Sequence, residues 1–145
     1  MTVLRKTAPA RFWIISLLIT LWGAIGVAAF YLDVTTSPAA VAQMSDYDRT
    51  LRASRPDWFM WLYGAATWAG LLGGLLLLRR LVVARAVLIV ALVLVVAMFG
   101  YIFAVTDLIA VKGVVTAAGF PIALVLIAAA QIWFATHARR HGWIV

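Results

Sequence analysis

Four charged side chains mark the ends of the apolar runs of this chain. Asp33, Asp57 and Asp107 each stand at one end of an apolar run, and Lys112 precedes the last run. If the runs are antiparallel helices, these four residues converge in one plane at an outer mouth. Three carboxylates there could attract a cation or hold a divalent metal.

The same residues also have a structural interpretation. Carboxylates at helix ends commonly cap free N–H groups, and they pair with nearby basic groups. The segment between the first two runs supplies three such groups, Arg49, Arg52 and Arg55. We expect the acids to act as caps and interfacial charges, and we expect no metal site.

A second set of polar side chains lies inside the apolar runs. Its members are Trp22, Thr67, Trp68, Tyr101 and Gln131. Together they could line a cavity for a sugar, a quinone-like molecule or a lipid headgroup. Such groups more often hydrogen-bond between helices, at up to about 2 kcal/mol each, and we favour this structural role.

His137 and His141 are spaced so that a helix would place both on one face, where they could bind a metal. No cysteine or carboxylate accompanies them, which makes a metal site weak. Arg139 and Arg140 lie between them, and attraction of this cluster to anionic lipid accounts for it at about 1 kcal/mol per basic residue. We expect neither a metal nor any other cofactor.

The chain also lacks the groups that most membrane chemistry requires. No Asp, Glu, Lys, Arg or His lies in the central part of any apolar run, and there is no cysteine. Proton-coupled transport usually needs an ionisable group at membrane depth, so coupled transport is disfavoured. No Ser/His/Asp set, phosphate loop or paired carboxylates are present, and we therefore expect a protein that is not an enzyme.

The composition places the chain in a membrane. Hydrophobic residues make up 66% of the 145 residues and charged residues only 12%, with a mean hydropathy of +1.07. Four apolar runs, 12–32, 58–78, 86–106 and 113–136, each reach the length of about 20 residues that spans a bilayer. We predict an all-α membrane protein with one domain, 1–145, that forms an up-down four-helix transmembrane bundle.

Small residues in the first two runs predict close helix packing. Gly70 and Gly74 form a GxxxG motif, a spacing that lets two helices approach within a membrane. The wider set of predicted packing residues is Ala66, Gly70, Gly73, Gly74, Gly23 and Gly26. The pattern leaves open whether these contacts lie within one chain or between chains.

The connections have signals of their own. Ser37-Pro38 is typical of a helix start, and Asp48 and Arg52 form an i,i+4 pair in the favourable order. We predict one or two short amphipathic helices in 33–57, on the outer membrane surface over the mouth between the first two spans. Pro121 should kink the fourth span, because proline removes a backbone hydrogen bond.

The distribution of charge predicts the topology. Of the twelve basic residues, eight flank the spans on the side of the two termini, and all five acids lie on the other side. The positive-inside rule then places both termini in the cytoplasm, with anionic lipids at the cytoplasmic face of the membrane. The basic residues are too dispersed for a nucleic-acid surface.

Several short motifs resemble those of a known family. They are the run Leu21-Trp22-Gly23-Ala24-Ile25-Gly26-Val27, Ser37-Pro38, Pro56-x-Trp58 and Gly142-Trp143. The chain is similar over nearly its whole length to small four-helix bacterial inner-membrane proteins that often carry the label "sugar transporter". The motifs are turns, caps and packing residues, so the resemblance implies the fold more than a function. Members often carry Asn where Gly23 stands, which weakens any polar role there.

Two functions fit these observations. The first is a non-enzymatic membrane protein that acts through helix packing, either as an accessory subunit of a larger complex or as a homo-oligomer. The alternative is an uncoupled transporter or binder of a small neutral solute such as a sugar. The alternative requires a pocket between helices that reaches a surface, whereas dry, close-packed helices throughout would exclude it.

Overall fold

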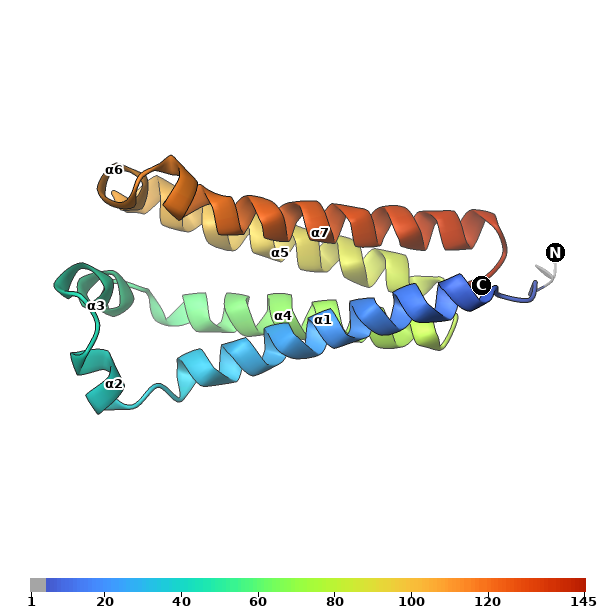
Figure 1. Cartoon of the computed structure of the whole chain (residues 1–145), viewed down its shortest axis with the longest axis horizontal. Helices are drawn as coiled ribbons and strands as arrows, with labels where there is room; N and C mark the ends of the chain where they lie inside the picture. Colours follow the sequence, from blue (N-terminus) through green and yellow to red (C-terminus); the bar gives the residue numbers. More distant parts are fainter. Residues whose placement is uncertain (1–4) are drawn as a thin grey trace.

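Residues 5–145 are described by a computed structural model, and helices are the regular secondary structure found across that range. Four of them are long: α1 (Ala10–Val34), α4 (Asp57–Leu78), α5 (Val83–Val105) and α7 (Val114–Arg140) (Figure 1). Each is long and apolar enough to cross a membrane. The prediction of an all-α chain with four membrane-span helices is therefore confirmed.

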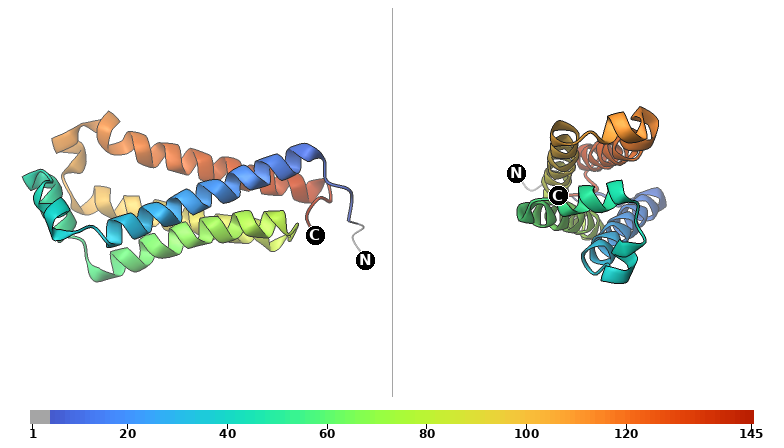
Figure 2. Two further views of the ribbon diagram at one scale, coloured as in Figure 1. Left: turned by 60° about the horizontal axis from the view of Figure 1, so that its bottom comes forward. Right: turned by 90° about the vertical axis from the view of Figure 1, so that its left-hand side faces the viewer.

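Three short helices lie together at the end of the molecule away from the termini (Figures 1 and 2). They are α2 (Pro38–Ala42), α3 (Asp46–Ala53) and α6 (Leu108–Lys112). Serines begin the first two, since the Ser37 hydroxyl accepts a bond from the Ala40 N–H at 3.2 Å and the Ser45 hydroxyl accepts one from the Asp48 N–H at 3.1 Å. We call this the α3–α6 end, and the opposite one the terminal end.

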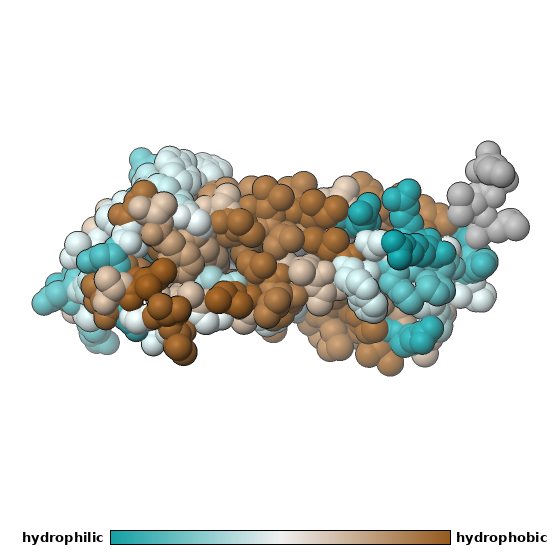
Figure 3. Space-filling model, turned by 90° about the horizontal axis from the view of Figure 1, so that it is seen from above, coloured by the Kyte–Doolittle hydropathy of each residue, from teal (hydrophilic) through white to brown (hydrophobic). Residues whose placement is uncertain are grey.

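The surface has the pattern of a membrane-spanning molecule. Figure 3 shows hydrophobic side chains over the middle of one face and hydrophilic side chains gathered towards its two ends. The fourth span continues as a single helix through Pro121, which is buried. The third begins at Val83, three residues before its predicted start, and the connection after it contains the short helix α6.

The closest contact between long helices joins α1 to α4, and glycine makes it possible. A Cβ atom on Gly23 would lie 2.5 Å from the Cα of Leu71, and one on Gly74 would lie 2.7 Å from the Cα of Thr20. Real side chains do not tolerate such distances to a neighbouring backbone, so the two helices touch through their main chains. Both glycines thus serve contacts within one chain.

The other predicted packing residues differ in what they meet. Gly73 faces α5, where a Cβ would lie 2.5 Å from Cδ2 of Leu88, and Ala66 is buried. A Cβ on Gly26 would make an ordinary contact with Thr67 at 3.6 Å. Gly70 has no atom within 4 Å of such a Cβ. The two residues of the GxxxG pair thus meet α1 differently. The main chain of Gly70 lies against Gly23, with its carbonyl carbon 3.0 Å from a Cβ on that residue, but only Gly74 has its own Cβ direction covered by α1.

All four long helices come together at the terminal end. Its core includes Phe12 of α1, Leu77 of α4, Leu88 of α5 and Phe134 of α7. The rings of Phe12 and Phe134 stack with their centres 5.9 Å apart. Towards the α3–α6 end α7 is far more exposed, and Val115 keeps 87% of its surface accessible. The bundle is thus closed at one end and splayed at the other.

Backbone hydrogen bonds lock the terminal end. The Val82 N–H donates to the carbonyl of Val145 at 2.9 Å, and the Val145 N–H donates to the carbonyl of Arg80 at 3.1 Å. Arg80 has a φ of 60°, and its Nε donates to the carbonyl of Trp143 at 2.7 Å. The Lys6 N–H donates to the carbonyl of Gly142 at 3.1 Å. The loop after α4 is thereby joined to the C-terminal segment, and the N-terminal segment is joined to the same C-terminal segment.

Replacing Gly74 with alanine tests the backbone contact of α1 with α4. The new methyl group must push the two helices apart, and we expect Gly74→Ala to lower the free energy of unfolding by roughly 1–3 kcal/mol. Gly100→Ala is the matched control, because Gly100 is exposed and has open space around it. Unfolding in a mild detergent measures both. Equal stability of the two variants would contradict the contact.

Candidate functional site

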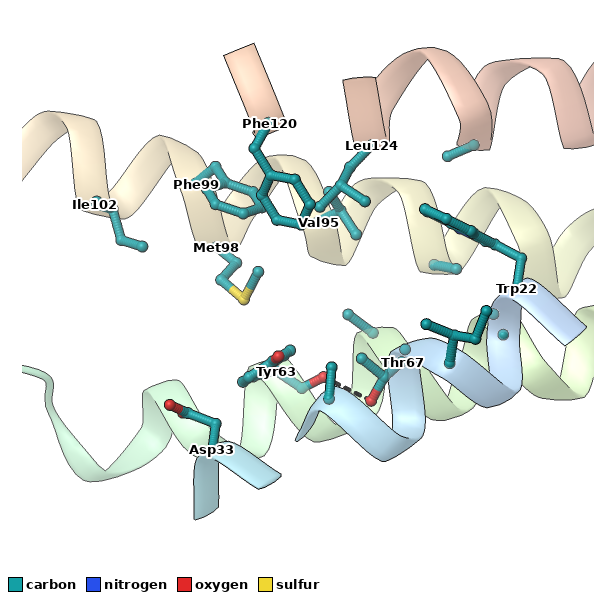
Figure 4. Close-up of a pocket in the computed structure, with 18 of the residues that line it drawn as sticks. Trp22, Asp33, Tyr63, Thr67, Val95, Met98, Phe99, Ile102, Phe120 and Leu124 are labelled. Atoms are coloured by element: carbon teal, nitrogen blue, oxygen red, sulfur yellow. Dashed lines mark hydrogen bonds between the residues drawn. The ribbon is translucent and has the colours of Figure 1, made fainter. Parts of the chain in front are cut away.

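A cavity of about 380 Å³ lies between the long helices, and all four contribute to its lining (Figure 4). This volume falls within the range of roughly 300–1,000 Å³ that is usual for small-molecule sites. Its walls are mainly apolar, and the larger apolar side chains are those of Ile25, Phe59, Val95, Met98, Phe99, Ile102, Phe120 and Leu124. The site is therefore suited to an apolar molecule.

The cavity follows from where small and large side chains fall. On the α1 and α4 side the lining includes Gly26, Ala29, Ala66 and Gly70, which have too little volume to fill the space between the diverging helices. Gly70 in particular leaves its Cβ direction empty. These small residues leave the space open beside the close contact of α1 with α4.

The cavity is open on one side. Its floor is formed by buried residues of α4 and α5, including Phe59, Ala91 and Met98. Its rim residues on α1 and α7 stay exposed, with Ile25 at 60% and Phe120 at 65% of their surface accessible. Since α1 and α7 make few contacts with each other, the opening lies between them. In a bilayer this opening would face lipid hydrocarbon.

Charged groups stand at one end of the cavity. Asp33 and Arg55 belong to the lining, and Figure 4 shows Asp33 at the opposite end from Trp22. Oδ2 of Asp33 accepts a hydrogen bond from Arg55 at 3.2 Å, and Oδ1 accepts one from Arg52 at 2.5 Å. The guanidinium of Arg55 also lies 5.3 Å from the centre of the Phe59 ring. One carboxylate thus pairs with two guanidinium groups.

Three of the five predicted ligand-lining residues line this cavity, namely Trp22, Thr67 and Gln131. The Thr67 hydroxyl already donates within its own helix, to the carbonyls of Tyr63 at 3.1 Å and Gly64 at 3.0 Å. Its bonding capacity for a ligand is therefore reduced.

The other two lie elsewhere. Trp68 is outside the lining and 48% exposed. Tyr101 borders an adjoining cavity under α3, which shares lining residues such as Arg55 and Phe59 with the first, and its ring centre lies 4.7 Å from that of Trp58.

The four predicted residues of the charge cluster make separate contacts in the structure. Asp33 pairs with Arg52 and Arg55 as described, while Asp107 accepts a hydrogen bond from the Tyr47 hydroxyl at 2.8 Å. Lys112 forms an ion pair with Asp48, and Asp57 is exposed in the first turn of α4.

Within residues 5–145 no group of three or more His, Cys, Asp or Glu side chains is placed to hold a metal. The rings of His137 and His141 lie with their centres 4.0 Å apart and their planes tilted by 36°. Nδ1 of His141 lies 2.9 Å from the carbonyl oxygen of His137. The pair is thus engaged in local contacts at the terminal end.

At the α3–α6 end, two contacts join the segment between α1 and α4 to the connection between α5 and α7. Tyr47 and Asp48 belong to α3, which precedes α4, whereas Asp107 and Lys112 belong to the connection between α5 and α7. The hydrogen bond from Lys112, and then that from Ser45, hold the pKa of Asp48 below its ordinary value. These contacts limit how far α1 and α4 can separate from α5 and α7 at this end.

The Asp48 ion pair predicts a titration. Because the pKa of Asp48 is lowered in the folded chain, the pair contributes stability above the ordinary Asp pKa, and this contribution is lost as the pH falls through the folded value. In Lys112→Met we expect the pKa of Asp48 to rise towards its ordinary value. Carboxyl-carbon NMR measures it directly, with Arg49→Met as the control. The same low pKa in Lys112→Met would show that the contact with α6 does not form.

Comparison of the chain with protein-family models, with characterised proteins and with solved structures finds no match. The resemblance to small four-helix inner-membrane proteins thus remains a prediction from the sequence motifs. The functional conclusion depends on the geometry of the cavity.

Proposed function

We propose that this protein is a non-enzymatic binder of an apolar small molecule, which it holds in the cavity between its four long helices. We further propose that it resides in a bacterial inner membrane with both termini in the cytoplasm, as the positive-inside rule predicts. The observation that carries the proposal is the cavity itself, which is apolar, of small-molecule size and open on one side. Its presence favours solute binding over action through helix packing alone.

The polarity of the lining narrows the class of molecule. A sugar presents many hydroxyl groups, and each one buried without a partner costs about 1–3 kcal/mol. The lining offers few partners along the middle of the cavity, where Thr67 is already bonded within α4. An apolar or amphiphilic molecule satisfies this lining better than the sugar considered from the sequence.

The chemistry of the site also favours binding or passage without ion coupling. The ionisable side chains in the lining are Asp33, Arg55 and Tyr63, and the first two are paired with each other. No ionisable side chain of α5 or α7 contributes to the lining. A movement of ligand through this cavity would therefore follow the ligand's own gradient.

Filling the cavity tests the proposal. In Gly70→Leu the new side chain can enter the open space. We therefore expect this variant to fold but not to retain the small molecule that the wild type binds. Gly100→Leu adds the same side chain at an exposed position outside the lining. Native mass spectrometry from a mild detergent compares the bound mass in the wild type and the two variants, and thermal unfolding reports folding.

Two results would refute the proposal. One is a wild-type protein that retains no small molecule under conditions in which it stays folded. The other is a folded Gly70→Leu variant that retains the same mass in the same amount as Gly100→Leu.

A role in assembly is the second candidate, and one observation favours it. Gly119 and Ala123 of α7 are both exposed and four residues apart, a spacing that suits contact with a further helix from another copy or from a larger complex. We expect Gly119→Leu to weaken such an assembly without unfolding the chain, because a Cβ at Gly119 meets nothing within 4 Å. Native mass analysis of protein extracted at its natural level tests this. If the wild type and Gly119→Leu are both monomeric, assembly through this face is excluded.

A further inference from the structure

The charged end of the cavity indicates what kind of molecule it takes. We propose that the ligand is an amphiphile with an anionic headgroup, bound by Arg55, and one hydrocarbon chain that lies in the apolar part of the cavity. This inference rests on the proposed function, since it specifies the ligand class of the same site.

Among Asp33 and the two arginines that pair with it, the balance of charge favours an anion. Arg52 and Arg55 carry two positive charges and Asp33 carries one negative charge, so the ion-paired group keeps one positive charge. Both carboxylate oxygens of Asp33 accept bonds from these arginines. The main-chain carbonyl of Asp33 accepts a further bond from Arg52, which ties this arginine to the end of α1.

Arg55 is the arginine placed to meet a ligand. It belongs to the cavity lining, whereas Arg52 does not. Within residues 5–145, Asp33 is the one hydrogen-bond partner of its guanidinium, which has five donors. Its position over the Phe59 ring keeps those donors at the cavity end. A phosphate or carboxylate matches such a planar, charged donor group.

The position of the charges also fits an amphiphile in a bilayer. Asp33 is next to the last residue of α1, and Arg55 comes two residues before α4, so the charged end lies at the edge of the membrane spans. The lining then follows α1 from Asp33 to Trp22, which at 1.5 Å per residue is roughly 16 Å. A headgroup at Arg55 would stay at the membrane surface while its chain runs along the hydrocarbon region.

The opening between α1 and α7 supplies a route. Its rim residues are apolar and exposed, so a chain can move in from the bilayer sideways while its headgroup stays at the surface. The volume of about 380 Å³ is at the lower end of the small-molecule range, which favours one chain in the cavity over two.

Matched ligands test the inference with the full-length protein in a mild detergent. Monopalmitoylglycerol and palmitoyl-lysophosphatidylglycerol share a chain and a glycerol ester, but only the second carries an anionic phosphate. Palmitate provides a carboxylate in place of the phosphate. Titrating each ligand and following the bound mass by native mass spectrometry gives the three affinities, and it also separates a lipid headgroup from a free fatty acid as the source of the anion.

We expect the wild type to bind the lysophosphatidylglycerol or palmitate at least about tenfold more tightly than the neutral monoglyceride, the ratio for one charge-assisted hydrogen bond. In Arg55→Gln the ratio of the anionic to the neutral affinity should fall to about one. Arg55→Lys should restore part of the preference. Arg49→Gln is the control, because Arg49 pairs with Asp46 and lies outside the lining.

The outcomes separate this inference from the proposed function. Equal binding of neutral and anionic ligands by the wild type, or a preference that survives in a folded Arg55→Gln variant, would overturn the anionic headgroup and leave the cavity as the binding site. If Gly70→Leu does not lower the affinity for any of the three ligands, the cavity is not the binding site and both proposals fail.

Discussion

The main-chain contact of α1 with α4 is the constraint on which the rest of the structure depends. Helices in a bilayer gain little from the hydrophobic effect when they associate, so close dispersion contact must hold them together. Gly23 and Gly74 allow that contact, because at each of them a side chain would collide with the opposite backbone. The same approach brings the end of α1 beside the start of α4, where Asp33 meets Arg55. One packing device therefore also places the charged end of the cavity.

The cavity results from how the two ends of the bundle are fastened. At the terminal end, the core around Phe12 and Phe134 and the hydrogen bonds between Val82 and Val145 bring all four long helices together. At the α3–α6 end, side-chain contacts outside the spans join the α1–α4 connection to the α5–α7 connection, as Tyr47 does with Asp107. From the terminal end towards the α3–α6 end the long helices diverge, and their side chains lack the volume to fill the gap. The structure thus holds a space open where a uniformly packed bundle would have none.

The sequence could predict the parts of this structure that depend on composition and local chemistry. Span lengths follow from hydropathy, the start of α2 follows from Ser37-Pro38, and close packing follows from glycine. Three polar lining residues were among the sequence candidates, but the apolar lining of the cavity could not be predicted. Apolar residues such as Val95 and Leu124 look the same in a sequence whether they face lipid, a helix or an open space. For the same reason Gly70 and Gly74 could not be told apart, since only the direction of α1 decides which one it covers. The φ of 60° at Arg80 had no signal either, because glycine is the usual residue there.

An apolar cavity that opens sideways into a bilayer differs from one in a water-soluble protein. The hydrocarbon region holds no water, so a ligand chain that enters the cavity releases none and gains little free energy from the hydrophobic effect. The chain also competes with the chains of the surrounding lipids, which have almost the same chemistry. The apolar walls can therefore select for shape but contribute little to preference among amphiphiles. Discrimination has to come from polar contacts at the edge of the membrane, where a charge-assisted hydrogen bond contributes about 1.5–3 kcal/mol. In this chain the charged contacts that border the cavity are those of Asp33 and Arg55, so under the proposed function selectivity among membrane amphiphiles would arise there.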